Sequence, residues 1–248
     1  LFKVGDRVTH ASMPIGAYSE KQIMPEEKLI SVPDGISDEV ASCITLKGIT
    51  AEYLLHRAYP LKKGDKVLYH AAAGALGQIL CPWANSLGAE VIGTVGSKAK
   101  EKIARKNGCH HVINYSEKDF VKEVEKIVGI NGIDVVYDGV GTKTFKGSIE
   151  TLKIRGMMVA FGNASGYVDT IGVKKDINAK GLFFTRPSIA HYTIKREELV
   201  ESAKKVFDAI LSNKFKVEIS KKYPLKDAAQ AHKDIEARLL TGPAVIIP

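Results

Sequence analysis

Short apolar strands alternate with helical patterns between residues 48 and 185, and this alternation constrains the fold more than any other feature. The strand candidates are apolar or β-branched runs, as buried parallel strands are. They lie at 66–70, 90–95, 111–115, 133–138, 156–162 and 181–185. Helical patterns separate the first five of them, which predicts an α/β fold built on a doubly wound parallel sheet. The successive units differ in sequence, which argues against a solenoid.

The two ends of the chain differ from this central pattern. Residues 1–47 are irregular and rich in short extended segments. Beyond 185, one apolar face predicts a helix over 197–213, with Asn213 as its C-terminal cap. The tail then predicts a strand, a helix and a strand, at 215–219, 226–240 and 244–247. Such a tail can pack back on the N-terminal part, so we divide the chain into 1–47, 48–185 and 186–248.

Composition excludes several classes of protein. The chain has 248 residues, of which 45% are hydrophobic, yet no apolar run approaches the roughly 20 residues that span a bilayer. Its cysteines, Cys43, Cys81 and Cys109, are widely spaced and odd in number. They argue against a disulfide framework and suit a reducing compartment, so we expect a cytoplasmic protein. The net charge of +8 suggests a phosphorylated cofactor or nucleic acid as partner, or only a solvated basic surface.

The turn after the strand at 66–70 has the spacing of a phosphate-binding turn. On the template G-x-G-x-x-G, residues 72–77 read AAGALG, so Ala72 replaces the first glycine. Gly74 would let the backbone approach a pyrophosphate, and Gly77 would let the next helix pack closely on the strand. That helix, expected to begin near Ala75, would direct free N–H groups and its positive dipole end at the phosphates. The motif alone equally fits an ordinary turn, but its βαβ context favours a dinucleotide.

The tip of the second strand distinguishes two nicotinamide cofactors. An NAD site usually has Asp or Glu about 20 residues further on, where it binds the ribose 2′-hydroxyl. Here that position holds Gly96 and Ser97, followed by Lys98 and Lys100. A carboxylate would repel a 2′-phosphate, whereas small residues and lysine accommodate it, so the sequence favours NADPH. The alternative is that both lysines belong to a solvated helix face.

Two further glycine-rich loops, at 138–141 and 161–166, follow later strands. Open α/β sheets bind ligands at strand ends, so we assign both loops, with Gly139, to the cofactor; ordinary turns are the alternative. The sequence has no C-x-x-C motif, and its histidines lie in unrelated contexts, so we expect no metal site. No catalytic acid or base is identified. Tyr53, Tyr115 and Asp138 are candidates, but buried structural roles are favoured for all three.

Seven motifs extend over nearly the whole chain. They are KGITAEYLL (47–55), HAAAGALG (70–77), GTVGSKAK (93–100), HVINY (111–115), YDGVG (137–141), FGNASG (161–166) and TRPS (185–188). Together they resemble the NADPH:quinone oxidoreductases, the zinc-free, zeta-crystallin-like branch of the medium-chain dehydrogenase/reductase superfamily. The resemblance implies a Rossmann NADPH-binding domain over 48–185, and a GroES-like β-rich catalytic domain to which the segment 186–248 returns. Residues 1–47 would be a remnant of that domain, because family members carry further residues before this point.

The resemblance also implies individual cofactor residues. Lys100, Tyr115 and Arg238 would surround the adenosine 2′-phosphate. Others would line the pyrophosphate (Gly74, Ala75, Leu76), the nicotinamide side (Tyr53, with Thr50 in the same motif), the length of the cofactor (Phe161, Gly162, Asn163) and its carboxamide (Phe183, Phe184, Thr185). Ala75 is a departure, because family members usually have glycine there. Alanine keeps the N–H donor, but its methyl group needs room and a negative φ.

The implied activity is NADPH-dependent reduction of quinones by a homodimer, without a metal. The cofactor supplies the reducing electrons, and a quinone ring is already electrophilic enough to accept them. Transfer of a hydride or of single electrons both remain open. A zinc-free enal or enone reductase is the neighbouring alternative, since it shares every cofactor residue. The alternative from another class is a nucleotide- or RNA-binding protein, although no basic stripe is interleaved with aromatic residues.

Overall fold

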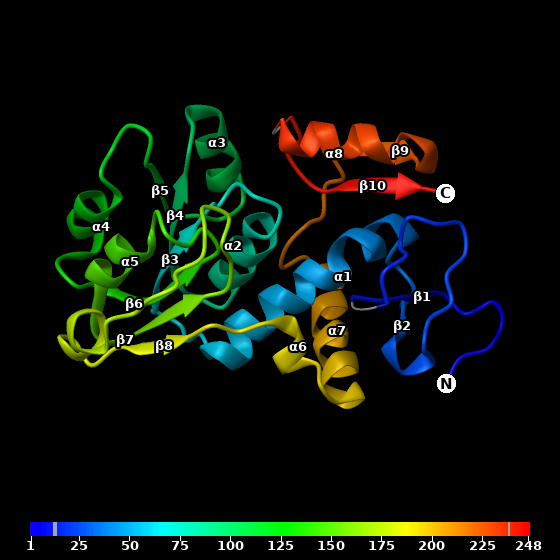
Figure 1. Ribbon diagram of the computed structural model, residues 1–248, viewed down its shortest axis with the longest axis horizontal. Helices are drawn as coiled ribbons and strands as arrows, with labels where there is room; N and C mark the ends of the chain where they lie inside the picture. The colour runs from blue at the N-terminus through cyan, green and yellow to red at the C-terminus, as the bar shows by residue number, and fades with distance from the viewer. Residues whose placement is uncertain (12–13, 238) are drawn as a thin grey trace. The chain divides into compact units, whose positions relative to one another are not determined.

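A six-stranded parallel sheet forms the centre of one part of the chain (Figure 1). In the computed structural model, which describes residues 1–11, 14–237 and 239–248, the strand order is β5-β4-β3-β6-β7-β8. The bounds are Lys66–His70 (β3), Glu90–Val95 (β4), His111–Asn114 (β5), Ile133–Asp138 (β6), Leu152–Ala160 (β7) and Phe183–Thr185 (β8). From β3 the chain runs outward to β5 on one side and to β8 on the other. The predicted doubly wound sheet is therefore confirmed.

Strand positions agree with the sequence pattern where the strand is buried on both faces. The predictions for β3, β4 and β6 coincide with the observed bounds. β7 begins four residues before the predicted 156, because residues 153–155 are exposed and carry no apolar run. Arg155 has a φ of +61°, and the register of β6 against β7 shifts between Ile133 and Val135. This irregular first half of β7 lies outside what a search for apolar runs can detect.

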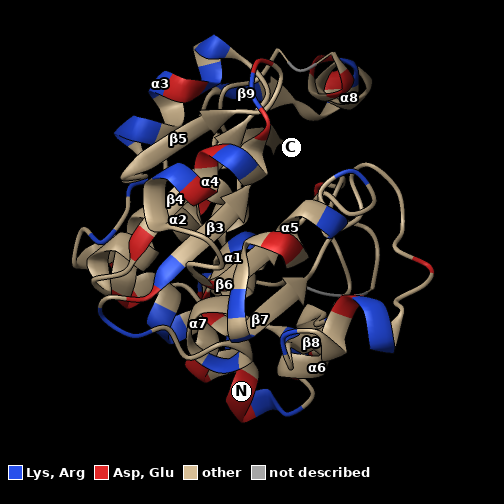
Figure 2. Cartoon of the chain, turned by 90° about the vertical axis from the view of Figure 1, so that its left-hand side faces the viewer, with Lys and Arg blue, Asp and Glu red and all other residues tan. Residues whose placement is uncertain are grey.

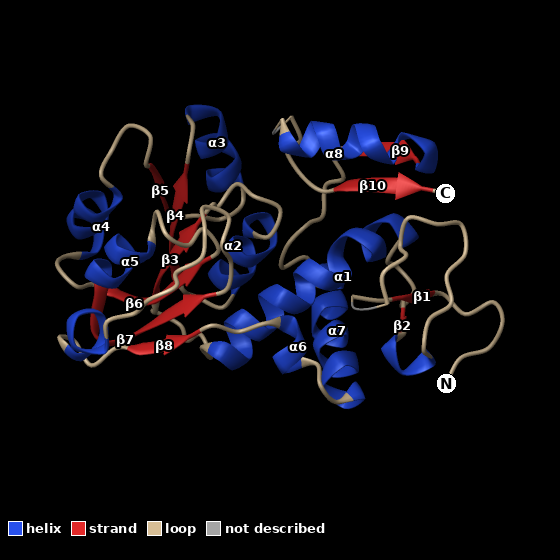
Figure 3. Cartoon of the chain, in the orientation of Figure 1, coloured by secondary structure: helices blue, strands red, loops and turns tan. Residues whose placement is uncertain are grey.

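Four helices connect the first five strands and cover the sheet (Figure 3). They are α2 (Gly77–Ser86), α3 (Lys98–Lys106), α4 (Phe120–Val128) and α5 (Phe145–Thr151). α2 packs against α3 on one face, and α4 packs against α5 on the other. The carboxylate of Asp119 caps α4 by accepting from the N–H groups of Val121 and Lys122. At the C-terminal end of α5, the Lys180 ammonium donates to three backbone carbonyl oxygens.

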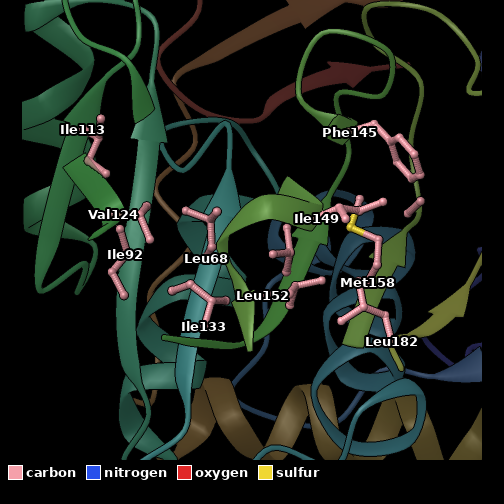
Figure 4. Close-up of a cluster of buried hydrophobic side chains, with 12 residues drawn as sticks. Leu68, Ile92, Ile113, Val124, Ile133, Phe145, Ile149, Leu152, Met158 and Leu182 are labelled. Carbon is pink, nitrogen blue, oxygen red and sulfur yellow. The ribbon is translucent and has the colours of Figure 1, made fainter. Parts of the chain in front are cut away.

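The hydrophobic core of this part lies on the sheet face that α4 and α5 cover (Figure 4). Each of its large aliphatic side chains contributes about 1.5–3 kcal/mol by burial. The labelled members are Leu68, Ile92, Ile113, Val124, Ile133, Phe145, Ile149, Leu152, Met158 and Leu182. Strands β3, β4, β5, β6 and β7 all contribute to this cluster, so its packing fixes the positions of these strands relative to one another.

The chain divides into two compact units, Tyr53–Ser188 around the sheet, and Leu1–Glu52 together with Ile189–Pro248. The second unit holds most of α1 (Asp38–Tyr53), and α6 (Ile189–Tyr192), α7 (Arg196–Leu211) and α8 (Ala228–Glu236). Its strands pair as β1 (Val8–Thr9) with β2 (Ile30–Ser31), and β9 (Lys221–Pro224) with β10 (Ala244–Ile247). Short 3-10 and π-helical turns are Glu26–Lys28, Leu225–Asp227, Leu54–Ala58 and Val173–Asn178.

Two predictions for this second unit have different outcomes. Asn213 has a φ of +56° just after α7, as expected of a helix C-cap region. The strand predicted at 215–219 is wrong, because pairing with β10 begins only at Lys221. In β9 only Tyr223 is buried, so the true strand lacks an alternating signal. Across the described ranges, none of the helices combines the length and apolar character needed to cross a bilayer.

Candidate functional site

The carboxyl ends of the parallel strands meet at one edge of the sheet. The register places His70 of β3 beside Thr94 of β4, and Asp138 of β6 beside Ala160 of β7. The loops that leave these ends carry most of the predicted cofactor residues. The strand order reverses between β3 and β6, and open α/β sheets bind ligands at that point. The edge formed by these loops is therefore the candidate site.

The loop between β3 and α2 presents backbone N–H groups with little side-chain bulk. The N–H of Gly74 donates to the carbonyl of Ala71 at 2.8 Å and closes a tight turn. Within the described part of the chain, the N–H groups of Ala75, Leu76 and Gly77 have no hydrogen-bond acceptor. Unpaired N–H groups at the positive end of a helix dipole attract an anion. The start of α2 thus has the donor set that a pyrophosphate requires.

Glycine and alanine have separate roles in this loop. A Cβ added to Gly77 would lie 2.7 Å from the carbonyl carbon of Ala72, so α2 can approach the turn only with glycine there. Ala75 is not among the residues with positive φ, so alanine is accommodated at this departure from the family pattern. The strained alanine is Ala71, which has a φ of +62°. α2 begins at Gly77, two residues after the predicted start.

The ends of β4 and β5 bring Gly96 and Tyr115 together. The N–H of Tyr115 donates to the carbonyl of Val95 at 3.0 Å, which extends the pairing of the two strands. A Cβ added to Gly96 would lie 2.6 Å from the Tyr115 hydroxyl oxygen and 3.0 Å from the ring carbon that bears it. Tyr115 is 50% exposed, so the buried role favoured for it is wrong. Its hydroxyl occupies the space that a side chain at position 96 would need.

The N-terminus of α3 adds positive charge at the same place (Figure 2). Ser97 is the N-cap residue, and its hydroxyl makes no capping hydrogen bond. Lys98 and Lys100 lie in the first turn, and neither has an ion-pair partner among the described residues. Five of the nine residues of α3 are basic and one is acidic. A free hydroxyl, a helix N-terminus and lysine ammonium groups together suit a phosphate dianion.

The loops after β6 and β7 pack on each other. A Cβ added to Gly139 would lie 2.9 Å from the ring of Phe161, and that ring stacks on Tyr69 with centroids 6.3 Å apart. The N–H groups of Phe161 and Gly162 donate to the carbonyl of Asp138 at 2.9 and 3.3 Å. Mutual packing of the two loops therefore accounts for their glycines. Asn163 follows Gly162 directly in the loop after β7.

The remaining predicted residues are more scattered. Phe183 is 58% exposed, whereas Phe184 packs its ring on Phe145 at 6.2 Å. Successive residues of a strand face opposite ways, so the two rings of β8 lie on opposite faces of the sheet. In α1, the Thr50 hydroxyl donates to the carbonyl of Leu46, and Tyr53 is buried at the end of the helix. Thr185 ends β8, and Arg238 lies outside the described residues.

A buried polar cluster beside these loops went undetected in the sequence. Its members are His70, Thr94, Asp138, Thr144 and Ser148. Burial lowers the pKa of the His70 imidazole, and the neighbouring Asp138 opposes that shift. The only local signal was the four-residue spacing of Thr144 and Ser148, which places two hydroxyl groups on one helical face. No group of three or more His, Cys, Asp or Glu side chains suited to a metal occurs in the described ranges.

A doubly wound sheet with an anion-binding turn at its first strand and a basic helix start at its second defines the class of dinucleotide-binding α/β proteins. The family described as Zinc-binding dehydrogenase matches residues 75–211. A 2-haloacrylate reductase from Burkholderia sp is 47% identical over all of this chain and 75% of its own length. Quinone oxidoreductase 1 of Escherichia coli (strain K12) is 44% identical, over 99% of this chain and 76% of its own.

Among solved structures, that of Escherichia coli quinone oxidoreductase complexed with NADPH superimposes on this one with a TM-score of 0.95 and 43% identity. It covers 100% of this chain, which in turn covers 76% of it. The chain therefore belongs to the zinc-binding dehydrogenase family, and within it to the quinone oxidoreductases of the medium-chain dehydrogenase/reductase superfamily.

Proposed function

We propose that this chain is an NADPH-dependent quinone reductase. The observation that carries the proposal is the tip of β4, where Gly96 and Ser97 lie beside Lys100 and the Tyr115 hydroxyl and no carboxylate occupies residues 95–98. A ribose 2′-phosphate finds donors and positive charge there, whereas the acid that binds a free 2′-hydroxyl is missing. Relatives named quinone oxidoreductase, at 44% and 40% identity, support the reaction.

The residues present fit the cofactor in three respects. Free N–H groups of Ala75, Leu76 and Gly77 would hold the pyrophosphate, and Lys100 with Ser97 and Tyr115 would hold the 2′-phosphate. The loop residues Gly139, Phe161, Gly162 and Asn163 would line the rest of the cofactor. When bound, NADPH supplies the two reducing electrons as a hydride or in single steps. The chain itself binds, orients and shields the reacting group.

Reduction of an activated alkene is the second candidate. The relative at 47% identity is named a 2-haloacrylate reductase, which favours an acceptor whose C=C bond is conjugated to a carboxylate or carbonyl group. Quinones and enones are both electrophilic at a carbon conjugated to a carbonyl, so one cofactor site serves either. Assays with a quinone and with an activated alkene as the electron acceptor distinguish the two candidate functions.

Assembly and location belong to the same proposal. β8 is the last strand of the sheet and exposes Phe183, so its free edge suits pairing with a second copy into a homodimer. The three cysteines are free and buried, as in proteins of a reducing compartment, which supports a cytoplasmic enzyme.

The test measures binding and turnover with both nicotinamide cofactors. Lys100→Ala should raise the Kd and KM for NADPH about tenfold, the worth of one charge-assisted hydrogen bond, and leave those for NADH unchanged. Lys102→Ala is the matched control, because it removes an exposed lysine of the same helix on another face. Equal effects of Lys100→Ala on both cofactors would exclude a 2′-phosphate role. Wild-type chain that reduces neither a quinone nor an enal would overturn the proposed activity.

A further inference from the structure

Asp138 ends β6 with a fully buried carboxylate that four donors surround. One oxygen accepts from the backbone N–H groups of Val140 and Gly141, at 2.7 and 3.0 Å. The other accepts from the hydroxyls of Thr144 and Ser148, at 2.7 and 3.2 Å. Two N–H groups and two hydroxyls thus lie within hydrogen-bond distance of this carboxylate, so Asp138 ties the loop after β6 to the start of α5.

His70 continues this chain of hydrogen bonds from α5 to β3 and β4. Its Nε2 lies 2.9 Å from the Ser148 hydroxyl oxygen, and its Nδ1 lies 2.9 Å from the Thr94 hydroxyl oxygen. The ring meets Phe120 edge to face, with centroids 5.0 Å apart. Both ring nitrogens of this buried histidine therefore have hydrogen-bond partners.

For a neutral ring, only one tautomer of His70 satisfies its partners. The Ser148 hydroxyl has one proton and faces two pure acceptors, the Asp138 carboxylate and the Thr144 carbonyl at 2.8 Å. Its proton goes to one of them, so His70 Nε2 must donate to the Ser148 oxygen. Nδ1 then carries the lone pair and accepts from the Thr94 hydroxyl. Donation therefore runs from Thr94 through His70 to Ser148, whose hydroxyl lies within hydrogen-bond distance of both Asp138 and the Thr144 carbonyl.

The four members stand at the base of three loops of the site. His70 directly precedes the turn that begins at Ala71, Thr94 lies two residues before Gly96, and Asp138 directly precedes Gly139. We propose that the Thr94–His70–Ser148–Asp138 chain positions these three loops relative to one another, with His70 and Asp138 as positioning residues of the nicotinamide cofactor site. The inference rests on the proposed function, since it assigns these loops to the cofactor. It adds residues that do not touch the cofactor but decide where its contacts lie.

Ser148→Ala interrupts the chain at its middle and leaves Asp138 three of its four donors. Thr151→Val is the matched control, because it removes another buried hydroxyl of α5 whose bond is local, to the Ser148 carbonyl at 2.8 Å. We expect Ser148→Ala to weaken NADPH binding about tenfold, as loss of a supporting hydrogen bond does at ligand sites, and Thr151→Val to bind as the wild type does. Circular dichroism and urea unfolding verify that both variants are folded.

Nitrogen-15 NMR of histidine-labelled protein measures the protonation of the His70 ring nitrogens, which a change in overall stability does not alter. Wild-type His70 should show the neutral tautomer protonated at Nε2, and Ser148→Ala should shift its Nε2 signal while Thr151→Val leaves it in place. An Nδ1-protonated ring would overturn the proton arrangement. Folded Ser148→Ala with wild-type affinity would overturn the positioning role alone. Wild-type protein that binds neither NADPH nor NADH would overturn the proposed function and this role with it, whereas the tautomer is decided independently.

Discussion

Gly77 is the position where one added methyl group tests the loop geometry most directly. In Gly77→Ala the new Cβ would lie 2.7 Å from the carbonyl carbon and 2.8 Å from the Cα of Ala72, and closer still to its oxygen. Ordinary contact begins at 3.4 Å, so the turn and the start of α2 must separate by about 0.7 Å or more. Backbone atoms make up the whole clash, so no side chain can rotate away to relieve it.

The separation has an energetic and a functional cost. Overpacking of this kind costs about 1–3 kcal/mol, and the better helix propensity of alanine returns about 1 kcal/mol. We therefore expect a net loss of about 0–2 kcal/mol in the free energy of unfolding. The shift also moves the free N–H groups of Ala75, Leu76 and Gly77. A displacement approaching 1 Å costs roughly ten- to a hundredfold at a binding site, so NADPH affinity should fall at least tenfold.

Urea unfolding and a fluorescence titration with NADPH measure the two effects. The single tryptophan, Trp83, is buried in α2, so its emission reports the helix that must move. Gly129→Ala is the control: it ends α4 with a φ of +83° and has no atom within 4 Å of the added Cβ. It should lose about 1–2 kcal/mol through backbone strain and keep wild-type affinity. Gly77→Ala with wild-type affinity would refute the reasoning.

Two further predictions concern titratable groups. Hydrogen bonds from Lys221, Tyr223 and Gln230 lower the pKa of Asp234 to about 2. Its folded pKa lies below the unfolded value of about 3.9, so its contribution is complete above that value and is lost as pH falls from about 4 to 2. Asp234→Asn should flatten the decline of the urea midpoint in that window, and an unchanged decline would contradict the assignment. Burial raises the pKa of the Cys43 thiol. The pKa of the Cys81 thiol is also raised, mainly by its hydrogen bond with Cys109 and secondly by burial. The folded protein should react slowly with a disulfide reagent at pH 8 and the urea-unfolded protein with three equivalents; fast reaction before unfolding would count against buried thiols.

The sequence pattern predicted those elements whose structure depends on neighbouring residues. β3, β4 and β6 are buried on both faces, so their apolar runs coincide with the strands. Gly77 was expected to permit close packing of helix on strand, and the contact that requires glycine is with Ala72, in the turn directly after β3. The donors at the start of α2 follow from the same strand–turn–helix order. For such features, neighbouring residues alone determine the structure.

Contacts between distant residues could not be predicted in this way. Ser148 meets His70 across 78 residues of sequence, and Thr94 meets it across 24, so no window of the sequence contains the chain they form. Tyr115 directly follows β5, and its position depends on how β5 pairs with β4. By contrast, the opposed rings of Phe183 and Phe184 follow from strand alternation, so the strand predicted at 181–185 already implied them. The site roles inferred from family resemblance remain predictions for the binding experiments above.

The contact between Gly96 and Tyr115 also bears on how cofactor preference can evolve. The simplest route to an NAD-type site is an acid at the tip of β4. A Cβ at position 96 would lie 2.6 Å from the hydroxyl of the half-exposed Tyr115, so any side chain there requires the tyrosine to move aside. The two positions are therefore coupled. An acid at position 96 would change two features of the site together, because it adds a carboxylate and displaces the tyrosine hydroxyl.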